Sequence, residues 1–266
     1  MTNFETIQLE KDKRGVATIT LNRVEKHNAL NSLMIKELTE MAAQIGSDET
    51  IRAVVLAANG KSFCAGGDLK WMQSQMEKDR DGKMEESRGL ANMLGALNSL
   101  PKFLIAKVQG SAYGGGVGMM AVADVVIANS KSKFALTETK LGLIPATIGP
   151  FVVNRMGENF ARQVFYSGKP FTVEFAKRAG LVTTAVEAED LNQAVEEEIS
   201  AILKCAPGAI ADAKALCQNL AGKAPSSQAD YTANQLADRW ESKEAMAGIE
   251  AFFNKQTAPW INETVE

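Results

Sequence analysis

Residues 53–68 read AVVLAANGKSFCAGGD, and this stretch decides the fold class. Its first half is a short apolar run that is typical of a buried β-strand. A glycine-rich turn follows, and Asp68 at its end is a suitable N-cap for a helix. The stretch therefore predicts a strand, a turn with bare backbone and the start of a helix.

The same pattern returns later in the chain. Residues 104–108 form another apolar run, and residues 110–118 read GSAYGGGVG before an apolar helical stretch. A further apolar run occupies residues 125–128. Helical stretches separate these runs, and strands that alternate with helices imply a parallel sheet. We therefore predict a protein of the α/β class.

The first part of the chain adds a hairpin and a helix to this sheet. Residues 6–10 and 15–21 alternate in strand fashion around a polar turn, which predicts an antiparallel pair at one edge. After Asn31 or Ser32 as a cap, residues 33–45 carry an apolar stripe with the helical period. We expect this helix to pack on the sheet.

From Glu189 onward the pattern is helical only, and it ends in a long amphipathic tail. A helical tail that does not belong to the alternating part is suited to an oligomerisation arm. The apolar residues of the tail are Leu236, Trp240, Ile249, Phe252 and Phe253.

Composition excludes several functions. The 266 residues include 29 basic and 32 acidic ones, a net charge of −3 that gives no basic excess for nucleic-acid binding. No apolar run approaches transmembrane length, and the first residues do not resemble an export signal. The three cysteines show no C-x-x-C spacing, which disfavours a disulfide framework or a zinc site. We expect a cytoplasmic protein that binds neither nucleic acid nor membranes.

His27 is the single histidine of the chain. Most hydrolases need a histidine base, and most metalloenzymes need several histidine ligands. We therefore expect no metal site and a chemistry that uses carboxylates or the backbone. Cys64 lacks the histidine partner of a cysteine nucleophile and is expected to serve packing.

The two glycine-rich turns do not match nucleotide-binding motifs. Residues 60–62 resemble the end of a P-loop, but Val55 stands where that motif requires glycine. The second turn lacks G-x-G-x-x-G because Met119 fills the last place. Glycines let a ligand approach the backbone, and amides from two turns can converge on one oxygen as an oxyanion hole. An isolated cluster more often permits tight packing only, but two in series favour the hole.

Two motifs carry a resemblance to a known family. Residues 63–69, FCAGGDL, resemble the F-x-A-G-x-D-[LI] signature of the crotonase, or enoyl-CoA hydratase/isomerase, superfamily. Residues 109–116, QGSAYGGG, are similar to its second signature. Similar segments extend over nearly the whole chain, at residues 21–30, 137–145 and 251–260.

The resemblance implies a fold and an assembly. It implies a crotonase-like spiral of ββα units in residues 1–200 and a helical trimerisation region in residues 201–266. It further implies a homo-oligomer, either a trimer or a dimer of trimers. The substrate would be an acyl-CoA thioester, so that coenzyme A enters as part of the substrate and no separate cofactor is implied.

The resemblance also implies roles for individual residues. The amides of Gly67 and Gly115 would be the oxyanion donors that polarise the thioester carbonyl and stabilise an enolate. Trp71, Met72, Met76 and Tyr113 flank the turns and are candidates for the acyl pocket, although such residues are more often plain core. The residues implied to contact coenzyme A are Lys26, Ala29, Ala65, Asp68 and Leu69, with Phe252 and Lys255 supplied by a neighbouring subunit.

The catalytic carboxylates depart from the family pattern. Hydratases of this family use two glutamates, one to activate water and one to exchange the α-proton. Glu138 matches the second, but Gly118 occupies the position of the first. One glutamate suffices to move a double bond, so an isomerase is an alternative. A binding-only member of the superfamily is another.

A finer resemblance favours hydration. Residues 136–153 and 68–72 resemble bacterial methylglutaconyl-CoA and γ-carboxygeranoyl-CoA hydratases, a branch that also has glycine at the position of Gly118. This implies conversion of 3-methylglutaconyl-CoA to 3-hydroxy-3-methylglutaryl-CoA in leucine and isovalerate degradation. We hypothesise that the second carboxylate of such substrates replaces the missing glutamate in orienting or deprotonating water.

Overall fold

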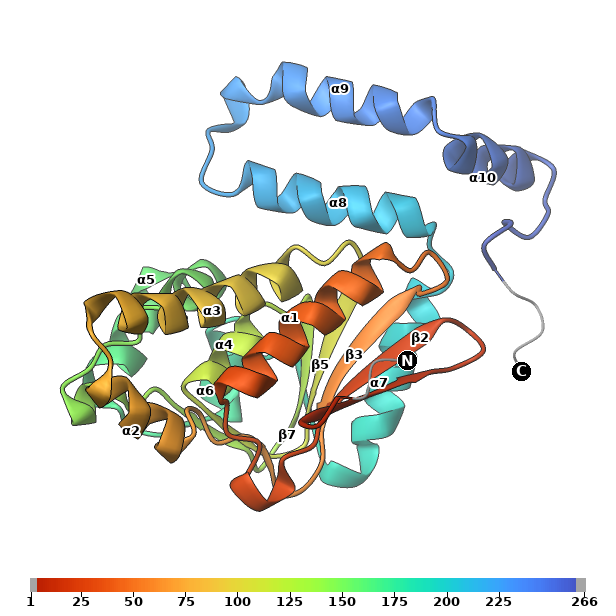
Figure 1. Ribbon diagram of the computed structural model, residues 1–266. Helices are drawn as coiled ribbons and strands as arrows, with labels where there is room; N and C mark the ends of the chain where they lie inside the picture. Colours follow the sequence, from red (N-terminus) through yellow and green to blue (C-terminus); the bar gives the residue numbers. More distant parts are fainter. Residues whose placement is uncertain (1–3, 262–266) are drawn as a thin grey trace.

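The computed structural model describes residues 4–261, and a large sheet forms its centre (Figure 1). β1 pairs antiparallel with β2, which confirms the predicted edge hairpin, and all other neighbours in this sheet are parallel. The strand order is β1 (Ile7–Lys11), β2 (Val16–Leu21), β3 (Ala53–Ala58), β5 (Phe103–Val108), β7 (Val125–Asn129) and β10 (Thr184–Val186).

A second, smaller sheet has two of its strands within the predicted glycine-rich turns. Its strands are too short for a periodic pattern to show, since each has two or three residues. Pairing with strands distant in sequence is what makes them extended. Their order is β4 (Ser62–Cys64), β6 (Ser111–Tyr113), β8 (Lys133–Ala135) and β9 (Phe171–Thr172).

Three successive units explain the spiral. In each unit the first strand joins the large sheet, the second joins the small sheet, and a helical segment follows. This architecture confirms the expected spiral of ββα units. The helices that follow β4, β6 and β8 are α2 (Leu69–Glu77) with α3 (Arg80–Asn98), α4 (Gly115–Ala121), and α5 (Gly149–Ser167).

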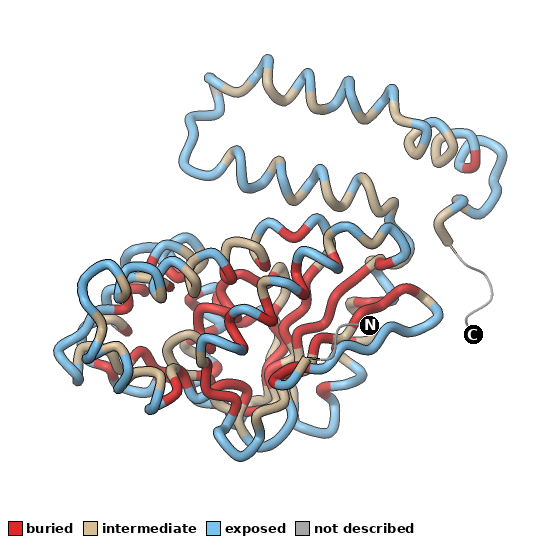
Figure 2. The backbone as a smooth tube through the Cα atoms, in the orientation of Figure 1, coloured by how far each residue is buried: buried red, intermediate tan, exposed pale blue. Residues whose placement is uncertain are grey.

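The large sheet is buried on both faces, as its unbroken apolar runs require. Successive side chains point to opposite faces, so Val54 and Leu56 enter the main core while Val55 packs with the other cluster. The helix α1 (Ser32–Ser47), capped by Asn31 as predicted, contributes to the main core. On the opposite face, α7 (Leu191–Ile202) covers Val55. The buried residues shown in Figure 2 follow this sheet.

The C-terminal helices extend away from this core (Figures 1 and 2). They are α8 (Pro207–Leu220), α9 (Ala229–Trp240) and α10 (Lys243–Phe253), and neither α8 nor α9 contains a buried residue. The predicted amphipathic tail therefore consists of two helices, α9 and α10. The side chain of Ser242 caps the start of the second one. The shorter elements are η1 (Val24–Lys26), η2 (Glu138–Leu141), α6 (Val173–Arg178), η3 (Ala188–Asp190) and η4 (Pro225–Ser227).

Within residues 4–261, no helix combines the length and the apolar character that crossing a membrane requires.

Candidate active site

The amide of Gly67 is turned away from its neighbouring segment. Leu30 N donates to Gly66 O at 2.7 Å, and Asp68 N donates to Leu30 O at 2.8 Å, which forms a parallel bridge between Leu30 and Gly67. In a parallel pair, the residue between the two bonded positions directs its own N–H to the other side. The Gly67 amide is therefore directed away from Leu30 and is available to a ligand.

The amide of Gly115 is available for a different reason. Gly115 is the first residue of α4, and the first amides of a helix have no intrahelical acceptor. The preceding Gly114 has φ 48°, a conformation that favours glycine. A Cβ atom at Gly115 would lie 2.4 Å from Leu30 Cδ1, so any side chain there would require Leu30 to shift. Leu30 thus borders both predicted oxyanion donors, one through its backbone and one through its side chain.

The two turns touch each other directly. A Cβ atom at Gly66, where φ is 91°, would lie 3.3 Å from Tyr113 O. A Cβ atom at Gly114 would lie 3.7 Å from Gly66 Cα. The structure therefore brings together the two segments that carry Gly67 and Gly115, as a shared oxyanion hole requires.

Glu138 lies beside this pair of turns. It begins η2, is half-buried, and places Oε1 3.2 Å from the Cβ position of Gly114. Its Oε2 atom is buried and has no hydrogen-bond partner within residues 4–261. Burial raises the pKa of this carboxyl, because the charged form loses hydration. A carboxyl with a raised pKa and a free oxygen is suited to proton transfer.

The position of the missing glutamate is filled by apolar side chains. Gly118 is buried in α4, and a Cβ atom there would lie 2.8 Å from Ile148 Cγ2 and 3.3 Å from Leu94 Cδ1. A side chain there would require Ile148 to shift and would press against Leu94. The predicted catalytic position at Gly118 therefore serves close packing in this chain.

The residues predicted to hold coenzyme A gather around one ion pair. Asp68 Oδ2 lies 3.0 Å from the Arg23 guanidinium, which also donates to Ala29 O. Asp68 also caps α2 by accepting from Lys70 N and Trp71 N. Burial acts to raise the pKa of Asp68, but Arg23 and the two amides outweigh it and lower the pKa. Asp68 thus has structural partners for both oxygens.

The other predicted coenzyme A contacts on the core are at the surface or close to Asp68. Ala65 N donates to His27 O at 3.0 Å, which ties this segment to the one carrying Lys26. Lys26 and Ala65 are exposed, and Leu69 is 82% exposed. The exposure of Lys26, Ala65 and Leu69 is compatible with contacts to a ligand.

Phe252 and Lys255 do not reach this region in one chain. Figure 1 shows α10 across the molecule from α2, and Phe252 is 78% exposed at the end of α10. Their expected contribution from a neighbouring subunit stays a prediction. The pattern of the sequence did not single out Arg23 or Leu30, although both lie within a quoted motif.

The remaining candidates differ in their surroundings. Burial raises the pKa of Cys64 to about 12, so its thiol stays protonated at neutral pH and serves packing. Met76 is 80% exposed, whereas Met72 Sδ and Trp71 Cζ3 lie 3.3 and 3.4 Å from the Cβ position of Gly67. Trp71 and Met72 therefore line the space beside the candidate donor.

The architecture is the ββα spiral of the crotonase class of enzymes. The family model for enoyl-CoA hydratase/isomerase matches residues 11–263. An enoyl-CoA hydratase of Alternaria alternata is 31% identical over 88% of this chain and 75% of its own. The chain belongs to the enoyl-CoA hydratase/isomerase family and is an enzyme of this type.

Solved structures agree with this assignment. An enoyl-CoA hydratase from Shewanella pealeana superimposes with a TM-score of 0.93 at 33% identity, and 97% of this chain matches 96% of that one. AtuE from Pseudomonas aeruginosa gives a TM-score of 0.93 at 36% identity, with 97% of this chain and 100% of that chain covered. An acyl-CoA thioester substrate is consistent with this family.

Proposed function

We propose that the protein adds water reversibly to 3-methylglutaconyl-CoA, a branched α,β-unsaturated thioester, and forms 3-hydroxy-3-methylglutaryl-CoA in leucine and isovalerate degradation in the cytoplasm. The observation that carries hydration by one glutamate is the buried, unpartnered Oε2 atom of Glu138 beside the two glycine turns. Gly118 supplies no carboxylate, and the side chains of Ile148 and Leu94 lie against its Cβ position.

The proposed mechanism uses the backbone and one carboxylate. The amides of Gly67 and Gly115 donate hydrogen bonds to the thioester oxygen and stabilise the negative charge that develops on it, and each such donor contributes about 3 kcal/mol. Glu138 takes a proton from water as the oxygen bonds to the β-carbon, and the double-bond electrons move into the enolate. Glu138 then returns the proton to the α-carbon, so that one water is added and the enzyme is restored.

The substrate supplies the group that is absent from Gly118. Its second carboxylate carries negative charge at the far end of the acyl chain, where it can orient the attacking water. Substrate assistance predicts that crotonyl-CoA, which lacks this group, is hydrated at least tenfold more slowly than 3-methylglutaconyl-CoA. Equal rates would rule out substrate assistance and leave Glu138 alone to orient and activate the water.

The test compares wild type with Glu138→Gln on the branched substrate, by mass and absorbance. Loss of a general base lowers the rate by about 10²- to 10⁴-fold. Hydration that disappears in Glu138→Gln supports the proposal. An isomerase is the second candidate, because a single glutamate can carry a proton between the α- and γ-carbons. Migration of a 3-enoyl-CoA double bond without mass change would establish it, and inertness toward every thioester would indicate a binding-only protein.

We also propose that the chain forms trimers or dimers of trimers through its C-terminal helices. Leu236 and Trp240 on α9 are 61% and 59% exposed, and Phe252 and Phe253 at the end of α10 are 78% and 76% exposed. Apolar side chains gathered on an extended arm are typical of a subunit interface. Light scattering should give three or six times the 28.6 kDa mass of one chain, and a monomer would exclude the assembly.

A further inference from the structure

The helix α2 borders the candidate donor Gly67 but is weakly anchored by apolar contacts. It contains no buried residue, and Met76 within it is 80% exposed. Helices in proteins are usually stabilised by an apolar face packed on the core. The position of α2 therefore depends to a large degree on polar contacts at its ends.

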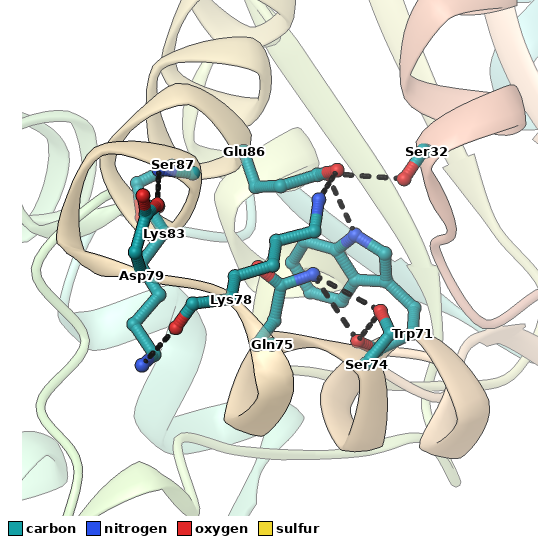
Figure 3. A network of polar contacts seen from close by, with 10 residues as sticks. Ser32, Trp71, Ser74, Gln75, Lys78, Asp79, Lys83, Glu86 and Ser87 are labelled. Carbon is teal, nitrogen blue, oxygen red and sulfur yellow. Dashed lines mark hydrogen bonds and ion pairs between the residues drawn. The ribbon is translucent and has the colours of Figure 1, made fainter.

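Glu86 on α3 provides such contacts (Figure 3). Its Oε2 accepts from Trp71 Nε1 at 2.9 Å and from Ser32 Oγ at 3.0 Å, and its Oε1 pairs with Lys78. These partners come from the first turn of α2, the start of α1 and the C-cap of α2. One carboxylate thus ties three helices together.

The carboxylate is sheltered and stays charged. The side chain of Glu86 is only 19% exposed. Lys78 lowers the pKa of this carboxyl, and the bonds from Trp71 and Ser32 act in the same direction against the effect of burial. Hydrogen bonds to an ionised acceptor are stronger than those between neutral groups. The bond from the indole of Trp71 is therefore a firm restraint on that ring.

The ring that Glu86 holds lies against the site. Trp71 Cζ3 lies 3.4 Å from the Cβ position of Gly67, so the indole borders the space beside this amide. We propose that Glu86 is a positioning residue that fixes the Trp71 indole beside Gly67 and thereby limits the bulk of the acyl group next to the thioester carbonyl. The inference rests on the proposed role of Gly67 but not on hydration.

The test measures binding, so that it remains informative whichever reaction the enzyme catalyses. Calorimetry gives the Kd of butyryl-CoA, which has a CH2 group next to its carbonyl, and of pivaloyl-CoA, which has a carbon with three methyl groups there. A fixed indole makes wild type prefer butyryl-CoA. We expect Glu86→Leu and Trp71→Phe each to reduce this preference about tenfold. The double variant should show no further reduction, because both changes remove the same hydrogen bond.

Matched variants separate positioning from general damage. Ser32→Ala leaves the indole bond in place and should retain the preference within about twofold. Glu86→Gln keeps an oxygen acceptor for the indole but loses the charge, so its preference should lie between those of wild type and Glu86→Leu. Circular dichroism and Tm establish that each variant is folded. Three outcomes would overturn the proposal. Trp71→Phe could raise the Kd of both ligands equally, or Ser32→Ala could reduce the preference as much as Glu86→Leu does. The third outcome is that wild type binds neither ligand.

Discussion

The two glycine turns have the same proposed task but lie in different surroundings. The turn at Gly115 opens α4, in which Gly116 and all later residues are buried, whereas the turn at Gly67 opens α2, which buries none. The first is locked by apolar packing, and the second is held by Asp68 and Glu86. One proposed donor thus begins a helix inside the core, while the other begins a helix at the surface that polar contacts hold.

Gly115→Ala should distort the buried turn and give the largest loss of kcat. Its Cβ would lie 2.4 Å from Cδ1 of Leu30, a buried side chain that would have to shift. Displacement of one oxyanion donor lowers kcat by about 10²- to 10³-fold. Steady-state kinetics with an enoyl-CoA that the wild-type enzyme converts measures this loss. Activity within threefold of wild type would show that the Gly115 amide is not a donor.

The pH profile tests the carboxylate that lies over this turn. Since burial raises the pKa of Glu138, its base form should be lost on acidification at a higher pH than for an ordinary glutamate. Below that pKa, kcat/KM should fall about tenfold per pH unit. A profile that stays flat down to the ordinary glutamate range would contradict this role.

The same raised pKa predicts a stability effect. An acid whose folded-state pKa is raised favours folding at low pH, and this contribution is lost as pH rises through the folded pKa. Glu138→Gln should therefore match wild type in the free energy of unfolding at low pH and exceed it at pH 8. Denaturant unfolding at the two pH values measures the difference, and the opposite ordering would count against a desolvated carboxyl.

Asp68→Ala should loosen the second turn moderately. It removes the N-cap of α2 and the partner of Arg23, and loss of a cap costs about 1 kcal/mol. Asp68→Asn is the matched control, because it keeps a capping oxygen and loses the charge. Chemical denaturation should give the highest free energy of unfolding for wild type, a lower one for Asp68→Asn and the lowest for Asp68→Ala. If Asp68→Ala unfolds with the same free energy as wild type, the cap does not stabilise α2.

Gly67→Ala should have the smallest effect of these substitutions, a small change in kcat/KM. The new Cβ would meet Met72 Cγ and Sδ at 3.3 Å, and these belong to a flexible side chain that can move by a few tenths of an ångström. We expect kcat/KM within about threefold of wild type, in contrast to Gly115→Ala. Comparable damage from both alanines would remove the distinction between the turns.

Much of the fold was predictable because its signals are local. The apolar runs at residues 53–57 and 104–108 became β3 and β5, and Asn31 and Asp68 cap the helices as predicted. The short strands of the second sheet were missed, because their extended form depends on partners far away in the chain. The break in the tail at Ser242 was also missed, as apolar residues continue on both sides of it.

The candidate site divides in the same way. Glycine content marked the two turns as candidates for ligand-facing amides, and the resemblance of the sequence to the family indicated Glu138 as the acid near them. Only the tertiary structure decided that Leu30 borders both amides, that Ile148 fills the space at Gly118, and that Glu86 restrains Trp71. These contacts join residues that are distant in sequence, and the winding of the spiral brings them within atomic distance.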